Sequence, residues 1–231
     1  MGPVFSSKPI AEDIFRGTSL NRKLWPVVYG KEVASNGGFW WDDALTQVRG
    51  GTLRLAMRRD AGGSWTAGGA SMIPKSWEPG LAIRYGKVDI IARVTNPVSG
   101  AGPCFLMWPA DGSWSHEIDI LETPQGRGMF TVHHKDPAGG DVGESRLFDI
   151  DLKNFHTYTL EWTPRSAALR IDGEIVTAIT EHIPDVPMSV GLQGHVGAPH
   201  EGWYGRPAPG PDLHSEIIVA SVRVFSYLRG S

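Results

Sequence analysis

The stretch that decides the fold is residues 116–122, His116-Glu117-Ile118-Asp119-Ile120-Leu121-Glu122. Apolar and acidic residues alternate through its first part, as expected for a β-strand with one face in a core. Glu117 and Asp119 are two residues apart, so they share a face and lie about 7 Å apart along the strand. Glu122 is five residues from Glu117, an odd offset that would turn its side chain to the opposite face of a regular strand. The stretch therefore predicts a strand whose third carboxylate is out of step with the other two.

Segments on both sides of this strand show the same alternation of apolar and polar residues. They are residues 52–57, 87–94, 157–162, 168–179 and 216–225. Asp172-Gly173 interrupts the fourth of them and is a dipeptide that favours a tight hairpin turn. No segment has apolar residues at a spacing of 3.6 over three turns, so long helices are not expected. Many short strands without a βαβ rhythm predict an all-β fold, a two-sheet sandwich or jelly roll.

The composition supports one folded domain spanning residues 1–231, with no functional weight given to the extreme termini. The chain contains 29 Gly, 17 Pro and nine Trp, which fits many strands joined by turns rather than disorder. Its single cysteine, Cys104, excludes an intrachain disulfide and a cysteine-based zinc site, and its apolar neighbours predict a buried, inert thiol. Residues 197–214 form a long loop rich in Pro and Gly, of the size that often carries function.

The charge and the apolar runs exclude two classes of partner. The formal net charge is −3, without the basic excess that nucleic-acid binding requires. No run of 18 or more apolar residues occurs, so no membrane span is expected. The first ten residues have no apolar signal core, so a secreted or periplasmic protein would need a signal peptide that this sequence does not include.

Acidic residues on a strand usually mark a solvated face, but the surroundings of 116–122 favour a cleft. Trp108 and Trp114 precede the stretch, and His133 and His134 follow on the next candidate strand. A β-bulge, which is frequent near active sites, would make the five-residue offset behave like four and return Glu122 to the face of Glu117.

With such a bulge at Ile120-Leu121, the two glutamates lie about 13 Å apart at Cα. Side chains leaning toward each other would bring their carboxyl groups to about 5–5.5 Å, the separation of a retaining glycosidase. A metal site is less favoured, because a hard cation takes oxygen ligands from a flexible loop rather than a strand. The glycosidase interpretation therefore requires the odd offset of Glu122 to be corrected by a bulge.

The stretch Glu117–Glu122 resembles the E-x-D-x-x-E signature of glycoside hydrolase family 16 in its bulged, laminarinase-like form. The resemblance extends over most of the chain in the family's order. It is carried by "WDDALTQVRGGTLRLAMR" (41–58), "YGKVDIIARV" (85–94, with Asp89 for the usual Glu), "CFLMWP" (104–109), "FHTYTLEWTP" (155–164) with "IDG" (171–173), and "ASVRVF" (220–225). It implies a two-sheet antiparallel β-jelly roll, concanavalin A-like, with a substrate cleft on the concave sheet.

The resemblance also implies roles for the three acidic residues. Glu117 matches the nucleophile, Glu122 the general acid/base, and Asp119 the assisting carboxylate between them. We expect Asp119 to hydrogen-bond Glu117, and the charges of both to raise the pKa of Glu122. His116 departs from the glycine common before the nucleophile.

A second set of residues is expected to bind the substrate. Trp114 matches the sugar-stacking wall, and His133, rather than His134, matches the histidine of the facing strand. Aromatic rings stack on sugars, and Trp40 and Trp41 have opposite faces if extended, so one belongs to the core and the other to the cleft. The predicted substrate-binding residues are Trp114, His133, Trp108, Asn36, Trp40 and Trp203.

The resulting functional prediction is a secreted or periplasmic retaining endo-glycosidase that cleaves a β-glucan with β-1,3 or mixed β-1,3/1,4 linkages. It needs no cofactor, and it is expected to be monomeric. The structural calcium ion common in the family has no clear ligand set here. Three alternatives stay open: a bacterial exopolysaccharide depolymerase, a transglycosylase of the same family, and a non-catalytic carbohydrate-binding jelly roll.

Overall fold

A computed structural model describes residues 2–59, 62–114, 116–207 and 214–228 of the chain. Nearly all of the regular structure in this part is strand, in two sheets, with two short 3-10 turns, η1 (Asp43–Leu45) and η2 (Pro124–Gly126). No helix among the described residues is long and apolar enough to cross a membrane.

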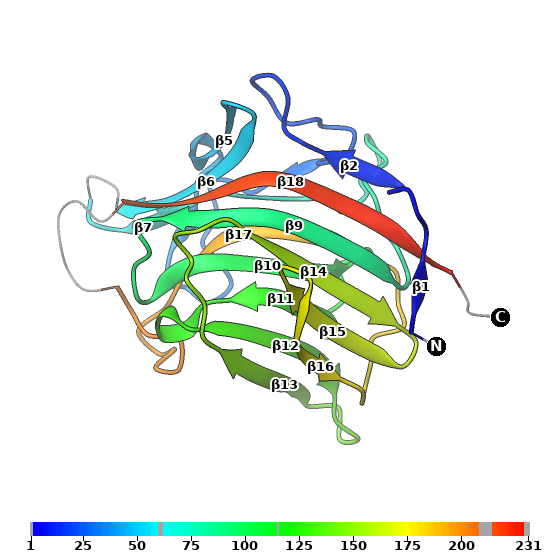
Figure 1. Cartoon of the computed structure of the whole chain (residues 1–231). Helices are drawn as coiled ribbons and strands as arrows, with labels where there is room; N and C mark the ends of the chain where they lie inside the picture. Colours follow the sequence, from blue (N-terminus) through cyan, green and yellow to red (C-terminus); the bar gives the residue numbers. More distant parts are fainter. Residues whose placement is uncertain (1, 60–61, 115, 208–213, 229–231) are drawn as a thin grey trace.

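The larger sheet has 11 strands, and its long members are bowed (Figure 1). Its strands are β1 (Val4–Phe5), β2 (Ala11–Asp13), β4 (Trp40–Trp41), β5 (Thr46–Arg49), β6 (Thr52–Arg59), β7 (Trp65–Ala67), β9 (Gly86–Thr95), β14 (His156–Thr163), β15 (Ser166–Ile171), β16 (Glu174–Ile179) and β18 (His214–Leu228). The order is β16-β15-β14-β9-β18-β6-β7-β4, with β1 and β2 paired to β18 and β5 paired to β6. All pairings are antiparallel except that of β4 with β7.

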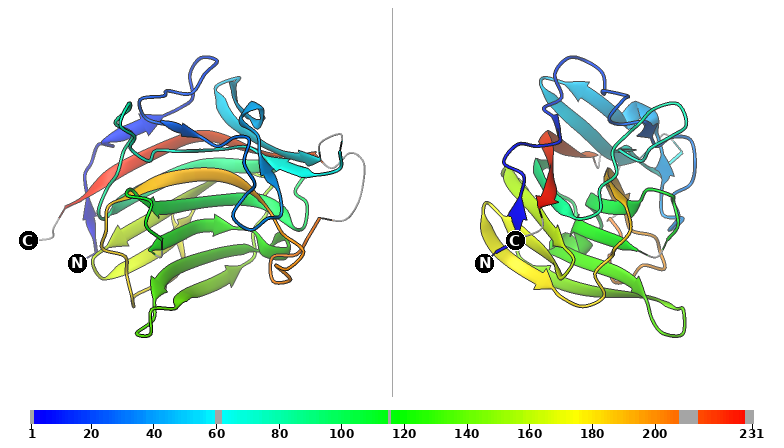
Figure 2. Two further views of the ribbon diagram at one scale, coloured as in Figure 1. Left: turned by 180° about the vertical axis from the view of Figure 1, so that it is seen from behind. Right: turned by 90° about the vertical axis from the view of Figure 1, so that its right-hand side faces the viewer.

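The second sheet has seven strands and lies across the sandwich from the first (Figure 2). Its strands are β3 (Val27–Val28), β8 (Gly69–Ser71), β10 (Ala101–Pro109), β11 (Glu117–Glu122), β12 (Gly128–Lys135), β13 (Asp141–Phe148) and β17 (Met188–Val196). The order is β13-β12-β11-β10-β17-β8-β3. This arrangement confirms the predicted two-sheet jelly roll.

The core forms where the alternating strands of the two sheets face each other. Leu53, Leu55 and Met57 of β6 are fully buried, because residues two apart on a strand share a face. Tyr158 and Trp162 of β14 are buried beside them in the same apolar cluster. The faces predicted for both segments are confirmed.

The hairpin between β15 and β16 turns at Asp172-Gly173, as the sequence indicates. Asp172 has φ of 53° and Gly173 of 89°. Positive φ at both central residues matches the right-handed twist of the flanking strands, and glycine adopts it without a steric cost.

Candidate active site

Strand β11 carries a β-bulge at the predicted position. Its residue Asp119 pairs with Thr131 of β12, whereas Glu122 pairs with Met129, so three steps on β11 oppose two on β12. On its other side, β11 shifts register against β10 at the same place. Both intervening residues, Ile120 and Leu121, are fully buried in the core. The extra residue therefore returns Glu122 to the face of Glu117 and Asp119, which confirms the bulge.

This face of the seven-stranded sheet is the floor of a cleft of about 1060 Å³. Alternate residues of β10 show how the strand divides its two faces: Phe105 and Met107 belong to the core, whereas Cys104, Leu106 and Trp108 line the cleft. The three carboxylates of β11 line the same cleft. Asp119 and Glu122 are 3% and 8% exposed, so two acidic groups are held in a largely buried floor.

Two hydrogen bonds orient the carboxylates. The indole Nε1–H of Trp114 donates to Glu117 Oε2 over 2.9 Å, a contact that favours the ionised form of Glu117. His133, which faces Glu117 across the β11–β12 pair, places its Nε2 2.9 Å from Asp119 Oδ2. A Cβ atom on Gly143 of β13 would lie 3.1 Å from the His133 ring, so glycine there leaves the ring its room.

The two glutamates have displaced pKa values. Burial, and then the charge of Asp119, raises the pKa of Glu117, while the bond from Trp114 opposes that rise. Burial raises the pKa of Glu122 well above its ordinary value, with further increments from Asp119, Glu117 and Glu201. The predicted direction for Glu122 is confirmed, but burial rather than neighbouring charge is its largest cause. Both carboxyl groups thus have raised pKa values, and the Trp114 N–H opposes the rise for Glu117.

The remaining predicted residues divide between the cleft and the surface. Trp108, Asn36 and Trp203 line the cleft, as do Trp114 and His133. Trp40 does not; it is 47% exposed and lies outside the lining residues. Its neighbour Trp41 lines the cleft instead and packs against Tyr29 and Phe39 at ring-centroid distances of 4.9 and 4.7 Å. The prediction for Trp40 is therefore corrected. Successive side chains on a strand point to opposite faces, and it is Trp41, not Trp40, that lines the cleft.

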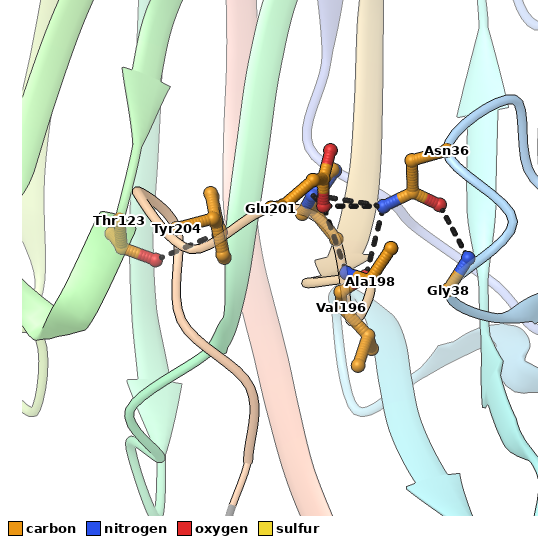
Figure 3. A network of polar contacts seen from close by, with 8 residues as sticks. Asn36, Gly38, Thr123, Val196, Ala198, Glu201 and Tyr204 are labelled. Carbon is orange, nitrogen blue, oxygen red and sulfur yellow. Dashed lines mark hydrogen bonds and ion pairs between the residues drawn. The ribbon is translucent and has the colours of Figure 1, made fainter.

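Asn36 reaches the cleft wall with both ends of its amide engaged. Its Nδ2 donates to Val196 O over 3.0 Å and to Glu201 Oε2 over 2.9 Å, and its Oδ1 accepts the Gly38 N–H over 2.9 Å (Figure 3). These contacts link the segments that form the cleft wall. They also occupy both hydrogens of the Asn36 amide that would otherwise bind a sugar hydroxyl.

Many residues of the cleft lining have no role in the sequence prediction, and five of them are Tyr29, Cys104, Gln193, His195 and Glu201. Cys104 is buried as predicted, but its Sγ lies 3.9 Å from Asp119 Oδ1 on the cleft floor, not in the core. Alternation along β10 from Trp108 predicts this position for Cys104. The other four come from distant segments, and no local pattern connects them to β11.

Comparison with known proteins adds three findings. The family model "Glycosyl hydrolases family 16" matches residues 37–206. Among curated proteins, endo-1,3-1,4-beta-glycanase ExsH of Rhizobium meliloti (strain 1021) is 30% identical over 151 residues, 61% of this chain and 31% of the relative. Beta-glucanase of Brevibacillus brevis is 31% identical over 116 residues, 49% of this chain and 44% of the relative. The chain thus spans less than half the length of these curated relatives.

Solved structures support the same fold over nearly the whole chain. The endo-beta-1,3-glucanase of Pyrococcus furiosus superimposes with a TM-score of 0.77 at 21% identity, covering 96% of this chain and 95% of that one. The laminarinase of Rhodothermus marinus gives a TM-score of 0.77 at 22% identity, covering 98% and 99%.

Proposed function

Because this chain belongs to glycosyl hydrolase family 16, we propose that it is a retaining endo-β-glucanase that cleaves β-1,3 or mixed β-1,3/1,4 linkages. The observation that carries the proposal is the bulge that aligns three carboxylates on one cleft floor, with Trp114 bonded to the first of them. The curated relatives with beta-glucanase and endo-1,3-1,4-beta-glycanase names support this substrate class.

The proposed reaction is a double displacement. Glu117 attacks the anomeric carbon as Glu122 donates its proton to the glycosidic oxygen, and the leaving sugar departs as an alcohol. The bond to the sugar turns Glu117 into an ester without charge. Glu122, now ionised, takes a proton from water, whose oxygen attacks the anomeric carbon and releases Glu117 as a carboxylate. Two inversions retain the configuration of the anomeric centre.

Neighbouring groups have distinct tasks in this scheme. The Trp114 N–H stabilises the ionised nucleophile, and its ring, which is 44% exposed, offers a stacking surface at the cleavage point. His133 holds Asp119 against Glu117. Trp203, which is 51% exposed, offers a second aromatic surface at the cleft. All of these roles use residues of this chain, with no cofactor.

The substrate of such a cleft is a polymer, so we place the protein outside the cytoplasm, secreted or periplasmic, where glucans are found. We propose that it acts as a monomer, because one chain supplies every residue of the mechanism. Light scattering on the purified protein tests the monomer, and a stable dimer would contradict it.

The decisive experiment measures product release from laminarin, lichenan, agarose and an acidic exopolysaccharide. We expect oligosaccharides from laminarin or lichenan, with viscosity falling before much reducing sugar appears. Glu117→Ala should fold with the same urea midpoint and lose hydrolysis. Glu12→Gln, an exposed carboxylate on β2 of the other sheet, is the matched control and should retain hydrolysis.

Other outcomes point to the alternatives. Near-normal hydrolysis by Glu117→Ala contradicts the assignment of the nucleophile. Release from the acidic exopolysaccharide alone would identify a depolymerase, and products longer than the starting oligosaccharide would identify a transglycosylase. Binding without sugar release would identify a non-catalytic module.

A further inference from the structure

A fourth carboxylate, Glu201, lines the cleft on the side of Glu122. It lies in the turn that follows β17, and its side chain is 12% exposed. Its charge acts on Glu122, whereas the reaction proposed above assigns it no task.

The carboxylate of Glu201 is fixed by contacts that converge on one oxygen. Oε2 accepts the Ala198 N–H over 2.9 Å and Asn36 Nδ2–H over 2.9 Å, and it lies 3.4 Å from His195 Nε2 (Figure 3). The His195 ring is packed against Tyr204 at a centroid distance of 4.3 Å. Burial raises the pKa of Glu201, but the hydrogen bonds from His195, Ala198 and Asn36 outweigh burial and lower it to about 2. These contacts therefore favour the ionised form of Glu201.

The backbone fixes this turn relative to the catalytic strand. The Gly197 N–H donates to Gly100 O over 3.0 Å, immediately before β10. The Gln125 N–H, just beyond the end of β11, donates to Tyr204 O over 2.8 Å, and its Nε2 donates to Trp203 O over 3.0 Å. A Cβ atom on Gly197 would lie 1.8 Å from Gly205 O, so no other residue fits this close approach. The separation of Glu201 from Glu122 is thus set by main-chain bonds at both ends of the turn.

Among the residues that the structure describes, the charged groups that act on Glu122 are acidic. Asp119 and Glu117 act from β11 and Glu201 from the turn, while Cys104 of β10 and Tyr204 are buried titratable neighbours. Glu117 loses its charge when it forms the glycosyl ester. Glu201 does not react, so its negative charge acts on Glu122 in both halves of the cycle.

We propose that Glu201 is a positioning residue of the acid/base: its fixed negative charge adds to the effect of burial in keeping Glu122 protonated for leaving-group departure and basic for the attack of water. This inference rests on the proposed function and assigns Glu201 no contact with the reacting atoms. Asn36 and His195 act indirectly, because they hold the Glu201 carboxylate in place.

The test is the pH dependence of kcat/KM for Glu201→Gln on the best polymeric substrate. Glutamine keeps an oxygen for the Ala198 and Asn36 donors but removes the charge. The alkaline limb, which reports the acid/base in the free enzyme, should move to lower pH by about one unit, the effect of one charge acting beyond contact distance. Glu201→Asp should restore much of the limb. A uniform loss at every pH, with the limb unmoved, would reduce Glu201 to a structural residue.

An aryl glycoside with a 2,4-dinitrophenolate leaving group separates charge from structure. Because that group departs without a proton, Glu201→Gln should match the wild type in kcat/KM on it. An equal loss on both substrates overturns the inference. Glu32→Gln, a second cleft-lining carboxylate that is not among the groups acting on Glu122, is the matched control and should leave the limb in place.

The proposed function is tested separately in the same experiment. Glu122→Gln should lose the polymeric substrate and retain the dinitrophenyl glycoside. If Glu122→Gln keeps a normal profile on polymer, the assignment of the acid/base and this inference both fail. If Glu122→Gln behaves as expected and the limb of Glu201→Gln does not move, only the inference fails.

Discussion

Replacing Trp114 with phenylalanine isolates one hydrogen bond of the site. The wild-type indole N–H donates to Glu117 Oε2 over 2.9 Å, and phenylalanine keeps an aromatic ring at the cleft wall without that donor. Burial and the charge of Asp119 already raise the pKa of Glu117. Loss of the donor removes a hydrogen bond that opposes this rise, so the pKa should rise further.

The size of the effect follows from the exposure of the bond. A hydrogen bond to a charged group contributes about 1.5–3 kcal/mol. Trp114 is 44% exposed, so water replaces part of the lost interaction and the lower end of this range applies. About 1.5 kcal/mol corresponds to about one pKa unit. The acidic limb of kcat/KM should therefore move to higher pH by about one unit, with a loss of about tenfold below it.

The assay is the initial rate of reducing-sugar release across the full pH profile, at substrate concentrations far below KM. Trp108→Phe is the matched control, because Trp108 lines the same cleft without a hydrogen bond to Glu117 among the described residues. It should change kcat/KM by a similar factor at every pH and leave the limb in place. An unmoved limb in Trp114→Phe, or an equal shift in both variants, would refute the role given to the indole N–H.

Two further predictions concern stability. Leu121 is fully buried in the bulge, so Leu121→Ala should lower the free energy of unfolding by about 2–5 kcal/mol, as urea denaturation would measure; a loss below about 1 kcal/mol would mean that the bulge is not packed as described. The rings of His134 and His182 stack at 4.0 Å, and burial and then His182 lower the pKa of His134. The unfolded chain then binds more protons, so stability should fall as pH drops below about 6.5, and less so in His134→Gln. Equal urea midpoints against pH in both proteins would contradict this coupling.

The strands were predictable where one face is core and the other is not. The segments now seen as β6, β9, β14 and β18 show that alternation in the sequence. β17 shows it less clearly, because Ser189 and Gly191 on the face away from the core are buried as well. Only Gln193 and His195 mark that face as polar, and both line the cleft.

The candidate site was predictable to the extent that one strand carries it. The parity of Glu117, Asp119 and Glu122 requires a bulge, and that bulge is present. Parity also separates Trp40 from Trp41 but does not say which side is the cleft. The place of Glu201 in the site could not be predicted from the sequence. Only the fold brings it to Glu122, because it lies 79 residues further along the chain.

The bulge in β11 also affects how this strand can change in length over evolution. In a regular strand, deletion of one residue exchanges the two faces for everything beyond it, so such a deletion destroys both core and site. Deletion of Ile120 or Leu121 is different, because Glu122 would then follow Glu117 by four residues and stay on its face without a bulge. A lineage can therefore lose a residue here and keep its three acidic side chains aligned at every step. Related sequences that differ by a one-residue gap at this point should therefore still carry the same three aligned carboxylates.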